Sequence, residues 1–220
     1  MAASRYRLSS SLSTADVPAA AALAAAAFAN SPCYSQILGS TSTLQQRRDF
    51  LTWLFEKNIK LREGDGAFRT THDGGKMISF FMFCPPDARN PSFCDMVFAG
   101  LLTGLFYYGP AVVKRLLETK SWFENKELEV LGERAGKMIR LERMTVLPGY
   151  QGQGVGTFAL SAALREADAQ GRACILATQE RRNVVFYSRL GFIVVDESVV
   201  PIGDSYMNWI MIREPQSSSE

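Results

Sequence analysis

A glycine-rich segment late in the chain has the composition of a phosphate-binding loop. It reads Pro148-Gly149-Tyr150-Gln151-Gly152-Gln153-Gly154-Val155-Gly156 and lies between an apolar stretch and a segment with helical apolar periodicity. Successive glycines let backbone N–H groups approach a ligand, and the first turn of a helix adds partial positive charge. The segment predicts a site for a phosphate or pyrophosphate group, although such a string alone is also compatible with a simple chain reversal.

A dinucleotide-binding fold is one alternative for this loop. That fold places the glycines after an early strand and an acidic residue at the end of the next strand. Here the loop comes late, and the following strand, expected at residues 172–178, ends without Asp or Glu. The context of the loop therefore disfavours this alternative.

The loop instead resembles the acetyl-CoA motif of the GNAT N-acetyltransferase superfamily, Gln/Arg-x-x-Gly-x-Gly/Ala, with a proline upstream. The matching residues are Gln151, Gly154, Gly156 and Pro148, and a second signature of the superfamily is matched by Asn183, Phe186, Tyr187, Leu190, Gly191 and Phe192. Within the superfamily the chain is similar to the group that contains puromycin N-acetyltransferase, in outline over residues 12–30 and closely over residues 141–213. Ala177 departs from that group, which tends to have a glutamate there, so puromycin is not assumed as the substrate.

The resemblance implies acetyl-CoA as cosubstrate and Tyr187 as general acid, because a phenol with an unperturbed pKa of about 10 can protonate a departing thiolate. Glu142, which alternates with Arg140 and Met144 along one strand face, is the candidate base for the amine proton. A surface ion pair with Arg140 or Arg143 is its alternative role. The cofactor-binding residues expected from the resemblance are Met144, Thr145, Val146, Gln151, Gly152, Gln153, Gly154, Val155, Gly156, Thr157, Asn183, Phe186 and Tyr187.

These residues need a sheet and flanking helices to position them. Hydrophobic periodicity and turn residues predict strands at residues 6–12, 66–71, 76–84, 137–147, 172–178, 192–200 and 206–213. They predict helices from about Pro18 to Phe28 and at residues 44–61, 96–117, 121–132, 154–170 and 183–190. The alternation of strands and helices after residue 137 predicts parallel pairing in part of the sheet, with the last strand antiparallel.

The resemblance adds the overall architecture, an α/β GNAT fold with a central mixed, splayed sheet flanked by helices. We expect one domain over residues 1–220, with a helical insert at about 87–136 and a flexible tail at 214–220. The chain has 220 residues, 47% of them hydrophobic, which suffices for a single core. No second domain is needed.

Charge and cysteine usage exclude several classes of partner. The net charge is +2 with interspersed signs, so neither nucleic acid nor an anionic membrane is expected as an obligatory partner. The four cysteines show no CxxC spacing and His72, expected at the surface of a hairpin, is the one histidine, so no metal site is expected. Reduced thiols favour the cytoplasm, although residues 1–15 superficially resemble a transit peptide and leave organellar targeting open.

The uncharged stretch at residues 96–113 approaches the length of a membrane span, but glycines and Pro110 interrupt it. A buried or groove-lining helix ending near Gly109 is the expectation instead. The acceptor is expected to be a primary amine of a small molecule, in a pocket walled by the first two helices and the insert. The aromatic candidates for this pocket, of which only a few should line it, are Phe28, Tyr34, Trp53, Phe106, Tyr107, Tyr108, Trp122 and Phe123.

Two other functions remain open from the sequence. A protein or peptide amine, either a lysine or an N-terminus, could replace the small molecule as acceptor. A CoA-binding sensor that has lost catalysis is the second alternative, against which the presence of Tyr187 argues. A homodimer is compatible with the sequence.

Overall fold

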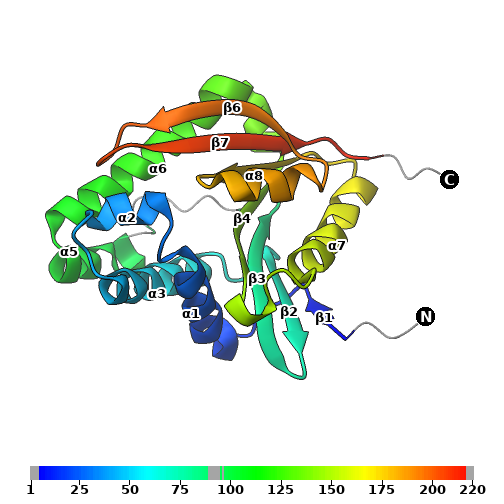
Figure 1. The fold of residues 1–220 in the computed structure, drawn as a ribbon, viewed down its shortest axis with the longest axis horizontal. Helices are drawn as coiled ribbons and strands as arrows, with labels where there is room; N and C mark the ends of the chain where they lie inside the picture. The colour runs from blue at the N-terminus through cyan, green and yellow to red at the C-terminus, as the bar shows by residue number, and fades with distance from the viewer. Residues whose placement is uncertain (1–4, 89–94, 96, 217–220) are drawn as a thin grey trace.

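A computed structural model of the chain describes residues 5–88, 95 and 97–216. Its centre is a seven-stranded mixed sheet with the strand order β1-β2-β3-β4-β5-β7-β6 (Figure 1). The strands are β1 (Arg7–Ser9), β2 (Phe68–Asp73), β3 (Lys76–Cys84), β4 (Ile139–Val146), β5 (Cys174–Thr178), β6 (Ile193–Val200) and β7 (Tyr206–Arg213). The expected GNAT architecture of a mixed sheet flanked by helices is confirmed.

Helices cover both faces of this sheet. They are α1 (Val17–Phe28), α2 (Pro32–Leu38), α3 (Leu44–Leu61), α5 (Leu102–Tyr108), α6 (Pro110–Leu131), α7 (Val155–Ala169) and α8 (Arg181–Ser188). Short helical segments are η1 (Thr14–Asp16), the π-helical η2 (Val97–Leu101), η3 (Gly132–Lys137) and η4 (Pro148–Tyr150). In Figure 1, α1, α2, α3 and α5 lie to the left of the sheet and α7 lies to the right.

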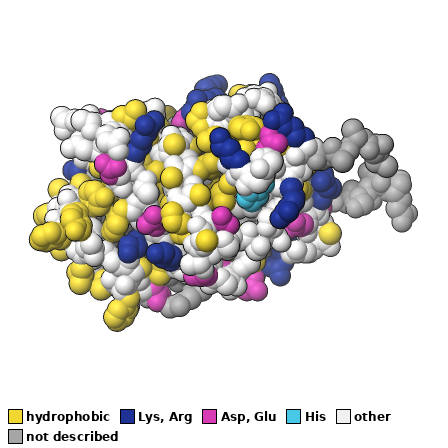
Figure 2. All heavy atoms as spheres, turned by 90° about the horizontal axis from the view of Figure 1, so that it is seen from below, with side chains coloured by type: hydrophobic (Ala, Val, Ile, Leu, Met, Phe, Trp, Pro, Cys, Tyr) yellow, Lys and Arg dark blue, Asp and Glu magenta, His cyan; other side chains and the backbone are white. Residues whose placement is uncertain are grey.

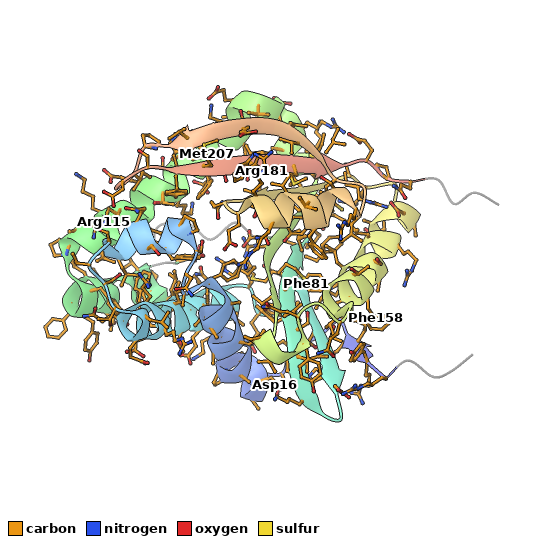
Figure 3. The ribbon with its side chains drawn as sticks, viewed as in Figure 1. Asp16, Phe81, Arg115, Phe158, Arg181 and Met207 are labelled. Atoms are coloured by element: carbon orange, nitrogen blue, oxygen red, sulfur yellow. The ribbon has the colours of Figure 1, made fainter. Side chains whose placement is uncertain are left out.

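The central strand β3 divides the hydrophobic core into two layers. Its side chains alternate between the two faces, because successive residues of a strand point in opposite directions. Phe80 and Met82 pack into the cluster formed with α1 and α3. Phe81 and Phe83 pack into the cluster formed with α7, and Figure 3 shows Phe81 on that side of the sheet. Both faces of β3 are therefore buried, which explains its continuous apolar sequence.

The sheet opens between β4 and β5. These strands are parallel, but only Ile139–Cys174 and Arg140–Ile175 are paired in the ladder. Beyond these residues the two strands separate, whereas β5 pairs along its whole length with the antiparallel β7. The expected splay and the mixed pairing are both confirmed.

Most element positions agree with the sequence expectations, and α3 begins and ends where its periodicity predicts. Its start is fixed by a capping box, in which Thr43 accepts from the Gln46 backbone and Gln46 accepts from the Thr43 backbone. Helix α2 was not predicted. It is only seven residues long, and Pro32 at its first position had no long apolar period after it to reveal a helix.

The insert differs from the prediction in two respects. The predicted break between residues 117 and 121 is wrong, because α6 is continuous and the break lies at Gly109, whose φ of 81° is followed by Pro110 at the helix start. The preceding helix does end near Gly109, but it is neither buried nor groove-lining. Phe98, Phe106 and Tyr107 are 90%, 84% and 70% exposed, and Figure 2 shows hydrophobic side chains gathered at this end of the molecule.

Parts of the predicted insert and tail, residues 89–94, 96 and 217–220, lie outside the described residues, and so does Cys94. Within the described part of the chain, no helix has the length and hydropathy needed to cross a membrane. The same residues contain no group of three or more His, Cys, Asp or Glu side chains placed to hold a metal ion.

Candidate active site

A cavity of about 630 Å³ occupies the space where β4 and β5 separate. Its walls come from the ends of these strands and from α2, α3, α6 and α8. Cavities of this size accommodate small ligands. Both predicted catalytic residues line it, Glu142 from β4 and Tyr187 from α8. Residues that are far apart in the sequence are thus brought to one site by the splay of the sheet.

A β-bulge in β4 shapes the wall of this cavity. Met82 pairs with Glu142 and Phe80 pairs with Thr145, so two residues of β4 oppose the single residue Phe81 on β3. The extra residue is Arg143, whose φ of 54° is unusual for a residue with a side chain. Beyond the bulge, Thr145 is buried and its hydroxyl donates to the Phe80 carbonyl at 2.7 Å.

The bulge corrects one expectation about side-chain direction. Arg140 and Glu142 lie on the same face of β4, as alternation predicts, since their partners Glu127 and Arg62 belong to α6 and the end of α3. Met144 does not share this face, because it packs into the cluster of α7 and α8. One inserted residue moves every later side chain to the opposite face.

The Glu142 carboxylate is held between two guanidinium groups. Arg143 Nη1 donates to Glu142 Oε2 at 2.6 Å, and Arg62 Nη2 lies 3.6 Å from Glu142 Oε1. Burial raises the pKa of Glu142, but Arg143 and Arg62 outweigh it and hold the pKa below its usual value. The group is therefore ionised at neutral pH. Arg143 also lies over the ring of Phe55, 5.4 Å from its centroid.

Tyr187 presents a protonated hydroxyl to the cavity. Its ring packs edge-on against Phe186 and Phe192, at centroid distances of 5.1 and 5.8 Å. The side chain is 8% exposed, and its hydroxyl forms no hydrogen bond with any residue that the structure describes. Burial raises the pKa of Tyr187, so the group keeps its proton at neutral pH and is able to donate it.

The glycine-rich loop joins β4 to α7 and exposes its backbone. Gly152 and Gly154 have φ values of 74° and 79°, and both are exposed. The first backbone N–H groups of α7, at Val155, Gly156 and Thr157, have no intrahelical acceptor. The loop and helix start therefore offer a cluster of donors and the positive end of the helix dipole, as the phosphate-site prediction requires.

The side chains of the loop hold it in shape. Gln151 Nε2 donates to the Val146 carbonyl at 3.0 Å, and Gln153 Nε2 donates to the Gly149 carbonyl at 2.7 Å. These two predicted cofactor-binding residues thus leave only their backbone groups for a ligand, and the Val146 carbonyl is already engaged. The sequence gave no sign of this internal clamp.

Gly156 fits closely between elements. A Cβ at this position would lie 3.4 Å from Phe186 and 3.5 Å from Val146. Glycine thereby allows α7 to approach β4 and α8 at the place where the strands separate. Phe186 packs against the same cluster as Met144, and Asn183 Nδ2 donates to Thr178 Oγ1 at 3.1 Å. Asn183 therefore ties α8 to the end of β5 on the wall of the cavity.

Three of the aromatic candidates line the acceptor side of the cavity, namely Phe28, Tyr34 and Phe123. The others lie elsewhere: Trp53 packs against Tyr108, Trp122 packs against the core of α1 and α3, and Phe106 and Tyr107 are exposed. His72 is half-buried on β2 and is not among the cavity residues. This agrees with the expectation that only a few aromatic residues would line the pocket.

Several cavity residues were not predicted. Arg62, Arg143, Thr119 and Gln179 all line the cavity. Arg143 could not be identified from the sequence because its position depends on the bulge, and Arg62 and Thr119 are long-range neighbours of β4 and β7. Gln179 had a weak signal, since it directly follows the strand end at Thr178.

Comparison with known proteins assigns the fold. The family model of the acetyltransferase (GNAT) domain matches residues 121–194, from the second half of α6 into β6. The chain is also similar to solved structures over nearly its whole length. A histone acetyltransferase HPA2 and related acetyltransferase from Corynebacterium glutamicum aligns with a TM-score of 0.63 and 17% identity, over 98% of this chain and 99% of the other.

Two further structures show the same fold. The ribosomal-protein-S18-alanine N-acetyltransferase from Escherichia coli aligns with a TM-score of 0.55 and 17% identity, over 98% of this chain and 97% of the other. An N-acetyltransferase from Thermoplasma acidophilum in complex with coenzyme A aligns with a TM-score of 0.53 and 12% identity, over 95% and 98%. The grouping with puromycin N-acetyltransferase is not confirmed and stays a prediction. The chain has the GNAT fold, and its matched segment supports an N-acetyltransferase that uses acetyl-CoA as cosubstrate.

Proposed function

We propose that this protein transfers an acetyl group from acetyl-CoA directly to a primary amine of a small molecule. The observation that carries the proposal is the cavity at the splay of β4 and β5, which Tyr187 and Glu142 line together. The unbonded N–H groups at the start of α7 and the close approach allowed at Gly156 fit a pyrophosphate and its attached chain. Acetyl-CoA would supply the activated acetyl thioester.

In this proposal Tyr187 acts as the general acid. As the amine nitrogen forms a bond to the thioester carbonyl carbon and the carbon–sulfur bond breaks, the departing sulfur needs a proton. The Tyr187 hydroxyl donates one, because its raised pKa keeps it protonated and it has no competing partner among the described residues. The tyrosinate then regains a proton from solvent.

Glu142 is proposed to accept the proton that the amine loses, directly or through a water molecule. Its carboxylate is ionised and lines the cavity, as a base must be. The flanking Arg143 and Arg62 lower its basicity, which makes proton transfer from an ammonium less favourable. The pair of arginines therefore favours Glu142 as a relay to water over a strong base.

Transfer without an acetylated enzyme follows from the state of the cavity thiols. Cys84 lines the cavity, and burial raises the pKa of its thiol to about 12. Burial likewise raises the pKa of Cys33, on the same cavity, to about 11. Because the thiolate is the nucleophilic form, neither group is suited to carry the acetyl group at neutral pH.

The shape of the cavity supports a small acceptor. Helices α2, α3 and α6 all contribute to its wall, which limits access for a folded protein surface. The structural neighbours include both kinds of acceptor by name, an agmatine N-acetyltransferase at a TM-score of 0.59 and the ribosomal-protein-S18-alanine enzyme at 0.55. The fold alone therefore does not decide between them, and the proposal depends on the cavity.

An acceptor panel tests this proposal. Free CoA would be measured with acetyl-CoA and either small primary amines, lysine-containing peptides or peptides with free N-termini. We expect CoA release with at least one small amine, and slower release with every peptide. Efficient acetylation of peptides alone would refute the small-molecule acceptor, and tight acetyl-CoA binding without release in any reaction would indicate a sensor.

A further inference from the structure

Every charged side chain on the cavity wall already has a partner. The described lining residues include four cations and four anions, which are Arg62, Lys120, Arg140, Arg143, Glu124, Glu127, Glu142 and Glu180. The two sets cancel in charge. Each member also forms an ion pair, so the cavity is neutral locally as well as in total.

These pairs come from within the protein and leave no charge in excess. Arg140 Nη1 lies 2.5 Å from a carboxylate oxygen of Glu127, which is 7% exposed. Lys120 Nζ lies 2.5 Å from Glu124 Oε1, one turn apart on α6. Glu180 pairs with Arg182 outside the cavity. A charged group of a bound molecule would have to break one of these pairs or stay unpaired, and both cost free energy.

Uncharged polar groups of the cavity are, by contrast, unsatisfied. Thr119 of α6 is 4% exposed and lines the cavity, and its Oγ1 has no hydrogen-bond partner. A buried hydroxyl without a partner is costly, and a ligand group that pairs with it recovers that free energy. Thr119 is therefore a built hydrogen-bonding position rather than a spectator.

Gln179 at the end of β5 is a second such position. Its Nε2 donates to Asn208 Oδ1 at 2.8 Å, and Asn208 is fully buried on β7. This bond fixes the direction of the Gln179 amide and leaves its carbonyl oxygen as an acceptor at the cavity wall. The cavity thus offers oriented neutral donors and acceptors but no free charge.

Resting on the proposed acetyl transfer, we propose that the acceptor is a monoamine whose other polar groups are uncharged, such as a carboxamide or hydroxyl that pairs with Thr119 and Gln179. Amino acids with a free carboxylate and polyamines with a second ammonium group are disfavoured. The reactive amine occupies the Glu142 side of the cavity, where the proton is removed. Apolar parts of the acceptor lie against Phe28, Tyr34 and Phe123.

Two matched substrate pairs test this inference. The first is phenylalanine and phenylalaninamide, and the second is 1,5-diaminopentane and 5-aminopentan-1-ol. Values of kcat/KM would be compared per concentration of unprotonated amine, so that differences in amine pKa do not contribute. We expect the neutral member of each pair to be favoured by about tenfold or more, because the charged member buries a group without a counterion.

Reciprocal variants of the solvent-facing pair on α6 provide the matched control. Glu124→Gln leaves Lys120 unpaired and should raise the relative kcat/KM of phenylalanine by about threefold, the scale expected for a partly exposed ion pair. Lys120→Gln leaves Glu124 unpaired and should raise that of 1,5-diaminopentane similarly. Each variant should leave the other preference unchanged.

The role of Thr119 has its own test. Thr119→Val keeps the shape but removes the unpartnered hydroxyl, and we expect about a tenfold lower kcat/KM for phenylalaninamide, mainly through KM, with an unchanged KM for acetyl-CoA. Thr119→Ser should retain most of the activity. Equal KM values for the Val and Ser variants would overturn the assignment of Thr119.

The inference and the proposed function fail in different ways. If phenylalanine or the diamine reacts as well as its neutral partner, the monoamine inference is overturned while amine acetylation stands. If none of the four compounds reacts but another small amine in the wider panel does, the inference is overturned as well. Only an absence of CoA release with every small amine overturns the proposed function itself.

Discussion

The ion pair at the bulge makes a prediction about stability and pH. Arg143 contacts Glu142 at 2.6 Å, and the two side chains are 18% and 22% exposed. Removing one member of a buried pair costs about 3–5 kcal/mol. Because Arg62 still faces the other oxygen of Glu142, at 3.6 Å, we expect Arg143→Gln to lose about 3 kcal/mol of unfolding free energy at neutral pH.

This loss should depend on pH with a defined sign. In the parent protein the pKa of Glu142 is held below its usual value, so its ionised form stabilises the fold above the unfolded-state pKa of 4.5, and this stabilisation disappears as pH falls through the folded-state value. In Arg143→Gln, burial raises the pKa of Glu142 with less opposition. The variant should therefore be most destabilised at high pH and recover part of the loss on acidification, as Glu142 takes up a proton.

Urea unfolding at about pH 5 and about pH 8 measures both quantities. Arg143→Lys is the matched control, since it keeps the charge and has the same backbone requirement at φ 54°. We expect a larger loss for the Gln variant at pH 8 than at pH 5, and a smaller difference for the Lys variant. A loss for Arg143→Gln that is equal at both pH values would refute the electrostatic account of the pair.

The remaining predictions concern the reaction. Tyr187→Phe should keep acetyl-CoA affinity but lower the single-turnover rate by about 10²–10⁴-fold, the usual contribution of general acid catalysis; agreement with the parent within about twofold would remove Tyr187 from that role. Glu142→Gln should lower turnover most at low pH, where free amine is scarce, and an unaltered pH–rate profile would make Glu142 a structural charge. Gly154→Glu should abolish acetyl-CoA binding in calorimetry by placing a carboxylate at the helix start, whereas Gly171→Glu, also at a positive φ but at the other end of α7, should bind normally.

Local sequence signals were sufficient for the parts of the fold that depend on local physics. Helix α3 has a capping box and a clear apolar period, and the hairpin of β2 and β3 has Gly74 and Gly75 at positive φ, as its turn residues predicted. The glycine loop was likewise identified by composition, because positive φ at Gly152 and Gly154 needs glycine. These features require few long-range contacts.

The features that depend on long-range packing were not predictable. No residue type announces the bulge, because Arg143 adopts its conformation only when β4 pairs with β3. The ion pairs of Glu142 with Arg62 and of Arg140 with Glu127 join segments far apart in the chain. Sequence reasoning therefore placed Glu142 in the site but could not give its environment, which decides how basic it is.

The central claim is direct transfer from acetyl-CoA to an amine inside this cavity. The most direct test mixes the protein, loaded with one equivalent of acetyl-labelled acetyl-CoA, with the best amine of the panel, and follows the label after rapid quenching. The account predicts that label appears on the amine at the rate of CoA release, with no labelled protein at any time. Label accumulating on the protein, or CoA release without an acetylated amine, would contradict it.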